Sequence, residues 1–143
     1  MYERILLAYN GSAHSAAALR QAADLARLFA AELHVLGIVV TTGGLAMAQA
    51  AGPTDVIEME RTRIRRALET AAHDLKDQGV KVSACIRQGD PANEIVGYAL
   101  KIKADLVVLG HTDKGILARW FQGSIGSKLL SHLPCSLLIA TEH

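Results

Sequence analysis

The sequence predicts a single α/β domain in which helices cover both faces of a parallel sheet. Short apolar runs alternate along the chain with longer segments of helical period. The apolar runs are almost free of charge, which is typical of strands buried on both faces. The chain has 143 residues, half of them hydrophobic, and can bury one core without disulfides or metal. We therefore expect one domain over residues 1–143 with a doubly wound, Rossmann-type sheet.

Charge and composition exclude several classes of function. The chain has 15 basic and 14 acidic side chains, so it offers no general field to attract nucleic acid or an anionic membrane. No apolar stretch reaches the roughly 18 residues that span a bilayer, and residues 1–4 lack the features of a signal peptide. Cys85 and Cys135 are far apart and show no metal-ligand spacing, so we expect buried, reduced thiols. These features predict a cytoplasmic protein with no nucleic-acid or membrane partner.

Apolar runs and the turn and capping residues next to them predict the first strand, the first helix and the second strand. Residues 5–9 form an apolar run that closes in a polar turn, and Ser12 is a good N-cap for an alanine-rich helix reaching about Ala31. Residues 33–40 are rich in β-branched side chains and predict the second strand, followed by a small-residue loop over 41–52. The helix repeats small apolar residues at steps of three and four, which favours close packing on a sheet. These residues are Ala16, Leu19, Ala23, Ala26 and Ala30.

The second helix and third strand follow the same pattern. A helix is expected to begin near Pro53 or Thr54 and to end at Gly79, a typical C-cap. Its apolar face consists of Ile57, Ile64, Leu68, Ala71 and Leu75. Residues 80–86 predict the third strand. Asp90 then caps a further helix that has proline at its first position.

The last third of the chain predicts two more strands. Residues 105–109 form an unbroken apolar run, as expected for a strand buried on both faces. A helix is expected over 124–132, and Pro134 ends it. Residues 136–140 predict the fifth strand, whose apolar edge would invite pairing with a second copy. The alternation of strands and helices places ligands at the carboxyl ends of the strands.

Two segments predict a ligand site at the ends of strands one and four, where the order of connection reverses. The first strand ends in Tyr9 and Asn10. The fourth strand ends at Gly110, and a Gly-Ser pair at residues 123–124 opens the next helix, whose free N–H groups could hold phosphate. Asp113 lies in the same loop and opposes this interpretation. Two unit charges about 5 Å apart repel by roughly 3 kcal/mol at an effective dielectric near 20, whereas a helix end offers an anion about 0.3 to 1 kcal/mol.

Motifs along the whole chain resemble those of the universal stress protein family. They are Ile5-Leu6-Leu7 with Gly11-Ser12, Leu33-His34-Val35, Gly89-Asp90-Pro91-Ala92, the run from Ala104 to Gly110, Gly123-Ser124-Ile125 and Leu133-Pro134-Cys135-Ser136. The resemblance implies a five-stranded parallel sheet of order 3-2-1-4-5 and a homodimer formed through the last strand. It also implies a stress-response protein that binds ATP, ADP or AMP.

The nucleotide binders of this family resemble one another in Gly-x-x-Gly, nine residues, then Gly-Ser or Gly-Thr. The corresponding residues here are Gly110, Asp113, Gly123 and Ser124, so the second glycine is replaced. Asn10 stands where the family usually has an aspartate near the ribose and metal, and an amide supplies no charge to hold Mg²⁺. The resemblance implies a pocket that also includes Ala8, Tyr9, Val35, Leu109, Thr112 and Ile125.

Other interpretations of the sequence are weaker. The six histidines show no metal-ligand spacing, and the arginines of residues 61–66 are interleaved with glutamates, which predicts a solvated ion-pair face. No catalytic set is visible, and a slow ATPase lacks a base for water. A response-regulator receiver would need acidic residues after strands one and three, and a flavodoxin-like module would need a Ser/Thr-rich loop after strand one. The alternative that remains is a nucleotide-free dimerisation or interaction module with a vestigial site.

Overall fold

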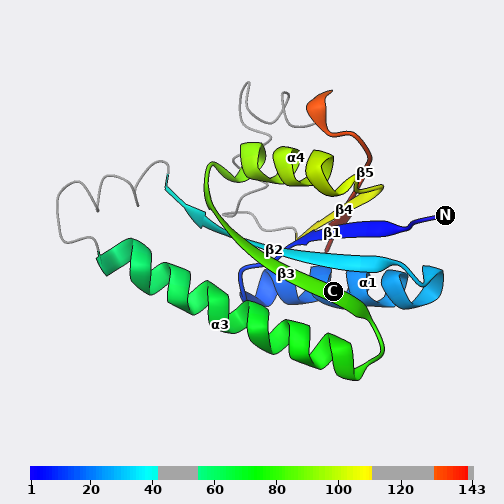
Figure 1. Cartoon of the computed structure of the whole chain (residues 1–143), viewed down its shortest axis with the longest axis horizontal. Helices are drawn as coiled ribbons and strands as arrows, with labels where there is room; N and C mark the ends of the chain where they lie inside the picture. The colour runs from blue at the N-terminus through cyan, green and yellow to red at the C-terminus, as the bar shows by residue number, and fades with distance from the viewer. Residues whose placement is uncertain (42–54, 111–130, 142–143) are drawn as a thin grey trace.

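Five parallel strands form the centre of the molecule, in the order β3-β2-β1-β4-β5 (Figure 1). The computed structural model describes residues 1–41, 55–110 and 131–141. The strands are β1 (Arg4–Ala8), β2 (Glu32–Val40), β3 (Lys81–Gly89), β4 (Leu106–Gly110) and β5 (Ser136–Ala140). The helices that lie wholly within the described residues are α1 (Ala13–Phe29), α3 (Asp55–Asp77) and α4 (Pro91–Ile102). The predicted fold class and strand order are confirmed.

Strand β1 lies in the middle of the sheet and pairs with both β2 and β4. Its residues Ile5, Leu6 and Leu7 have no exposed surface. Successive side chains enter opposite faces of the sheet, so Ile5 and Leu7 join one core cluster and Leu6 joins the other. The apolar run of β4 is buried in the same way on both faces, as its sequence predicted.

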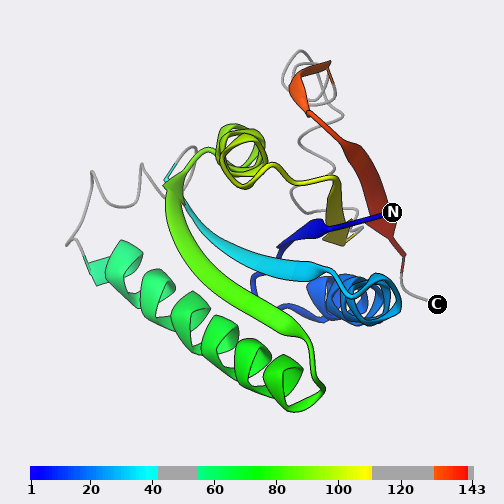
Figure 2. The same ribbon diagram turned by 45° about the vertical axis from the view of Figure 1, so that its right-hand side comes forward.

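The helices cover the two faces unequally. Figure 1 and Figure 2 show α1 and α3 on one side of the sheet and α4 on the other. The apolar face predicted for α3 is confirmed, because all five of its residues are buried. Helix α3 lies close to β2 at Gly37, where an added Cβ would be 2.5 Å from Cγ2 of Ile64. Glycine at this position therefore sets how closely the helix approaches the sheet.

Capping residues define most helix ends. Ser12 and Asp90 accept hydrogen bonds from the backbone N–H groups of Ser15 and Asn93, which confirms both predicted N-caps. Gly79 has a φ of +82° after α3 and confirms the predicted C-cap. Helix α1 ends at Phe29 rather than near Ala31. The chain leaves the helix at Ala30, whose φ is 53°, and Ala30 therefore does not belong to the helical apolar face.

Two further details differ from the sequence prediction. Strand β3 continues to Gly89, beyond residue 86, because it stays paired with β2 as far as Val40.

Cys85 and Cys135 are free thiols as expected, but both are only half-buried. Burial, and secondarily the negative charge of Asp105, raises the pKa of Cys135. Of the helix predicted over 124–132, only residues 131 and 132 are described, and they are helical.

The described helices give no sign of a membrane span. None of them is both long and apolar enough to cross a bilayer.

The close packing at Gly37 predicts opposite effects for two Gly→Ala substitutions. Gly37→Ala forces Ile64 and Leu68 to move, and we expect it to lower the free energy of unfolding by about 1 to 3 kcal/mol. Gly97 is an exposed helical residue of α4 with open space around it, so Gly97→Ala should raise stability by about 1 kcal/mol. Urea denaturation followed by circular dichroism measures both. Equal stability of Gly37→Ala and the wild type would contradict the packing argument.

Candidate functional site

Five of the predicted site residues lie at one edge of the sheet. The pairing of Leu7 with Val108 places the carboxyl ends of β1 and β4 side by side. Ala8, Tyr9 and Asn10 follow at the end of β1, and Leu109 and Gly110 end β4. The structure therefore brings these five residues together. Thr112, Asp113, Gly123, Ser124 and Ile125 lie outside the described residues.

Tyr9 and Val35 have packing roles in this structure. Val35 is 1% exposed and lies in the core cluster under α1 and α3. Tyr9 packs against the same cluster, and its backbone N–H donates to the carbonyl oxygen of Leu36 at 2.9 Å. Burial, and to a smaller extent the charge of Asp74, raises the pKa of the Tyr9 phenol. The adenine contact expected of Val35 stays a prediction.

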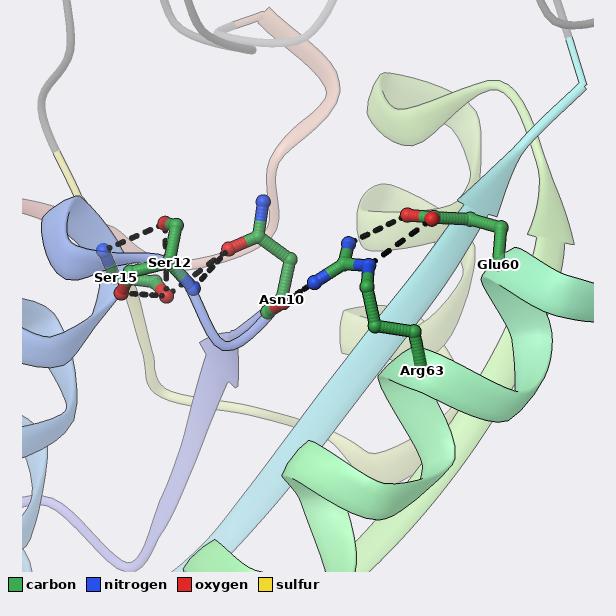
Figure 3. A network of polar contacts seen from close by, with 5 residues as sticks. All are labelled: Asn10, Ser12, Ser15, Glu60 and Arg63. Carbon is green, nitrogen blue, oxygen red and sulfur yellow. Dashed lines mark hydrogen bonds and ion pairs between the residues drawn. The ribbon is translucent and has the colours of Figure 1, made fainter.

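Asn10 is the best-anchored polar residue at this edge. Its Oδ1 accepts two hydrogen bonds at 3.0 Å, one from the backbone N–H of Ser12 and one from Oγ of Ser15 (Figure 3). Ser15 is 7% exposed and lies in the first turn of α1. Gly11, with a φ of +82°, permits the turn between them. The side chain of Asn10 is thus fixed by the start of the helix that follows it.

Helix α3 holds the same loop from the other side. Nη1 of Arg63 donates to the carbonyl oxygen of Asn10 at 3.0 Å. The guanidinium also binds both carboxylate oxygens of Glu60, at 3.0 and 2.5 Å (Figure 3). The hydrogen bonds from Arg63, and then its charge, lower the pKa of Glu60, and the pKa of Arg63 is raised in return. Arg63 therefore acts as a link between α3 and the end of β1.

The ion-pair face predicted for the arginines of residues 61–66 is present, and this link adds a contact that the prediction did not include. Arg63 and Arg61 do pair with glutamates of the same helix, as expected. In addition, Arg63 contacts Asn10, and Arg61 contacts the side-chain amide of Gln88 on β3. The reason is that α3 lies close enough to the sheet for long side chains on its flank to reach loops and neighbouring strands.

Sequence reasoning missed Ser15, Glu60 and Arg63 as parts of the site. Ser15 carried a usable signal, because a serine on a buried helix face needs a hydrogen-bond partner. Glu60 and Arg63 have the spacing of a helical ion pair, which explained them without any contact to the loop. The contact between Arg63 and Asn10 joins residues 53 positions apart and has no local signature.

Helix α3 also borders a surface groove beside this loop. The groove has a volume of about 600 Å³ and is lined by Glu58, Met59, Thr62, Arg63 and Arg66. Met59 is 70% exposed there. The groove shares Arg63 with the contact to Asn10, so it adjoins the end of β1.

A second polar group lies away from this edge, near the amino ends of β2 and β3. Nδ1 of His34 is 3.0 Å from Oγ of Ser83, and its Nε2 is 3.4 Å from a carboxylate oxygen of Glu32. Register places His34 opposite Ser83 in the sheet. In the part of the chain that the structure describes, no three His, Cys, Asp or Glu side chains gather as a metal site would require.

The comparison with known protein families shows which family this chain belongs to. A sequence model of the universal stress protein family matches residues 1–141. The chain belongs to the universal stress protein family. A universal stress protein of Methanocaldococcus jannaschii is 30% identical, with 99% of this chain and 84% of the relative covered. A universal stress protein of Thermus aquaticus is 31% identical, with 97% of this chain and 98% of the relative covered.

Solved universal stress proteins share the same fold. One from Burkholderia pseudomallei is 26% identical, with a TM-score of 0.75 over 96% of this chain and 95% of that chain. A universal stress protein in complex with cAMP gives a TM-score of 0.69 at 20% identity, with 97% of each chain covered. A family protein from Arabidopsis thaliana with AMP bound gives 0.69 at 17% identity, with 99% of this chain and 92% of that chain covered. At such identities, the last two show likeness of fold alone.

The ion pair of Arg63 and Glu60 predicts a pH-dependent contribution to stability. Arg63→Ala should raise the pKa of Glu60 toward its ordinary value and cost about 1 kcal/mol at neutral pH, from a surface ion pair and one hydrogen bond. Because the pKa of Glu60 is lowered in the folded state, its contribution is full above the unfolded pKa and is lost as pH falls through the folded pKa. The stability difference between wild type and variant should therefore shrink in acid.

Two measurements check this prediction. Carbon-detected NMR follows the titration of the Glu60 carboxyl in both proteins, and urea denaturation at neutral and acidic pH follows stability. Arg65→Ala is the matched control, since Arg65 is an exposed arginine of the same helix. An unchanged Glu60 titration in Arg63→Ala would show that the ion pair does not set this pKa.

Proposed function

We propose that this universal stress protein acts by binding an adenine nucleotide at the carboxyl ends of β1 and β4. The observation that carries the proposal is the pairing of β1 with β4, which brings Asn10 and Gly110 to the point where the chain connections reverse. Family relatives of the same fold that were solved with cAMP or AMP support the ligand class. Binding rather than turnover is proposed because the carboxylate described beside Asn10, that of Glu60, has both oxygens bound by Arg63 and is not free to activate water.

In this proposal each group of residues has a defined role. Ala8, Tyr9 and Val35 would contact the base, and Asn10 would hydrogen-bond the ribose or an adjacent oxygen. Leu109, Gly110 and Thr112 would line the ribose. Gly123, Ser124 and Ile125 would open a helix whose free N–H groups hold phosphate.

Asp113 weakens the phosphate part of the site. It occupies the second glycine position of the family motif, and the family resemblance implies that this position lies near the phosphates. An inward carboxylate would repel one phosphate charge by roughly 3 kcal/mol, more than a helix end contributes. A nucleotide with fewer charges, such as AMP, is therefore expected to lose less affinity than ATP.

A second candidate function is a nucleotide-free interaction module that works as a homodimer. The free side of β5 supports a dimer, because β4 is its sole partner among the described strands. Leu137, Leu138 and Ile139 are all only half-buried on this edge. An apolar strand edge of this kind pairs readily with a second copy.

An ATP titration of the wild type and Asp113→Gly tests the nucleotide proposal. We expect the variant to bind at least about tenfold more tightly, because removing the carboxylate relieves a repulsion larger than 1.4 kcal/mol. Isothermal titration calorimetry gives both dissociation constants, and the nucleotide content of the purified protein is measured beside it. Glu69→Gln removes one exposed charge from α3 and is the control for a general charge effect.

The outcomes of that titration separate the two functions. Equal and tight binding by wild type and Asp113→Gly would show that Asp113 does not oppose phosphate. Absence of binding by both proteins, with ATP and with AMP, would reject the nucleotide proposal and favour the interaction module.

The dimer predicted through β5 is tested by molecular mass in solution. Light scattering at micromolar concentration should give twice the chain mass for the wild type and a lower mass for Leu137→Lys, because a charge on the half-buried edge opposes pairing. Leu100→Lys places the same charge at an exposed leucine of α4 and should stay dimeric. Circular dichroism confirms that both variants fold. A monomeric wild type would contradict the prediction.

A further inference from the structure

The orientation of one amide decides how the proposed site treats metal, and the inference below rests on the proposed function. The family resemblance implies an aspartate near the ribose and Mg²⁺, whereas this chain has Asn10. An aspartate presents oxygen atoms at both ends of its carboxylate, but an asparagine presents one oxygen and one NH₂ group. The ligand therefore meets a different atom according to which way the amide is turned.

The surrounding groups fix that choice. The backbone N–H of Ser12 can only donate, so the Asn10 atom 3.0 Å away from it must be the acceptor, Oδ1. Oγ of Ser15 lies 3.0 Å from the same atom. Turning the amide over would place its NH₂ against the Ser12 N–H, so that two donors face each other, and would leave Oγ of Ser15 with the carbonyl oxygen of Ser12 as its acceptor. The orientation thus follows from hydrogen bonding.

The nitrogen of the amide faces the other way. In Figure 3, Nδ2 of Asn10 points away from both serines and from Arg63, beyond the carboxyl end of β1. Among the described residues, no hydrogen bond to Nδ2 is present, whereas both oxygens of Asn10 are engaged. Oδ1 accepts two donors, and the backbone oxygen accepts from the guanidinium of Arg63.

These contacts do not fit a magnesium ligand at position 10. Mg²⁺ takes oxygen ligands in near-octahedral geometry. The two acceptor positions of Oδ1 are already used, and the backbone oxygen faces a cation that would repel a second one. The group that remains is an N–H donor, which suits a ribose or phosphate oxygen.

We infer that Asn10 makes this site one for adenine nucleotides without a divalent cation. Asn10 is a specificity-determining residue in this inference, with Ser15 and Arg63 as the positioning residues that hold its amide. The ligand class is a nucleotide whose own oxygen accepts from Nδ2, with no metal bridging it to the protein.

The test compares ATP binding in EDTA and in Mg²⁺ for the wild type and Asn10→Asp. Because Mg²⁺ in solution also neutralises phosphate charge near Asp113, the quantity compared is the ratio of the dissociation constants in EDTA and in Mg²⁺. This ratio should be at least about tenfold larger for Asn10→Asp than for the wild type. Asn10→Asp should bind about tenfold more weakly in EDTA, because a carboxylate replaces the donor, and should recover in Mg²⁺. Asn93→Asp is the matched control at an exposed position of α4 and should behave as the wild type.

A second measurement uses Mn²⁺ alone and needs no nucleotide. Paramagnetic broadening of backbone amides 10–12 in ¹⁵N NMR spectra should occur in Asn10→Asp and be absent in the wild type and in Asn93→Asp. Broadening in the wild type, or a ratio of EDTA to Mg²⁺ dissociation constants as large in the wild type as in Asn10→Asp, overturns the inference and leaves the nucleotide site standing. If no protein binds ATP in either condition, the proposed function fails and the inferred ligand class fails with it.

Discussion

The pairing of β1 with β2 on one side and β4 on the other is the constraint on which the rest of the structure depends. It buries Ile5, Leu6 and Leu7 completely and divides their side chains between the two core clusters. Each cluster then needs its own cover, which α1 and α3 provide on one face and α4 on the other. The same pairing brings the ends of two strands that are distant in sequence to one edge. The pairing of β1 with its two neighbours therefore produces both the buried core and the edge that carries the candidate site.

The loop that leaves β1 is held by two separate elements, α1 and α3. Ser12 and Ser15 of the α1 terminus fix the side chain of Asn10, and Arg63 of α3 fixes its backbone oxygen. Close approach of α3 makes the last contact possible, since a Cβ on Gly11 would be 2.9 Å from that of Ala67. Under the proposed function, a loop with these constraints would lose little entropy when a ligand binds.

Local signals in the sequence were sufficient for the fold and for most of its boundaries. Apolar runs gave the strands, Ser12 and Asp90 gave helix starts, and Gly79 gave a helix end, because each acts through its nearest neighbours. The end of α1 was misplaced because Ala30 takes the left-handed conformation that glycine usually supplies. The end of β3 was misplaced because its last residues are strand by virtue of pairing with β2, a contact made across the intervening helix.

The common edge of Asn10 and Gly110 was predictable from the sequence, but the hydrogen bonding of Asn10 was not. Asn10 and Gly110 follow apolar runs, so their common edge follows from topology alone. Which atoms of Asn10 are left for a ligand depends on its hydrogen bonds with Ser15 and Arg63. The contact with Arg63 joins residues 53 positions apart in the sequence. From sequence, the change from aspartate to asparagine is only the loss of a charge. In the structure Oδ1 is occupied by two donors, so the atom left for a ligand is Nδ2, which donates a hydrogen bond where a carboxylate would accept one.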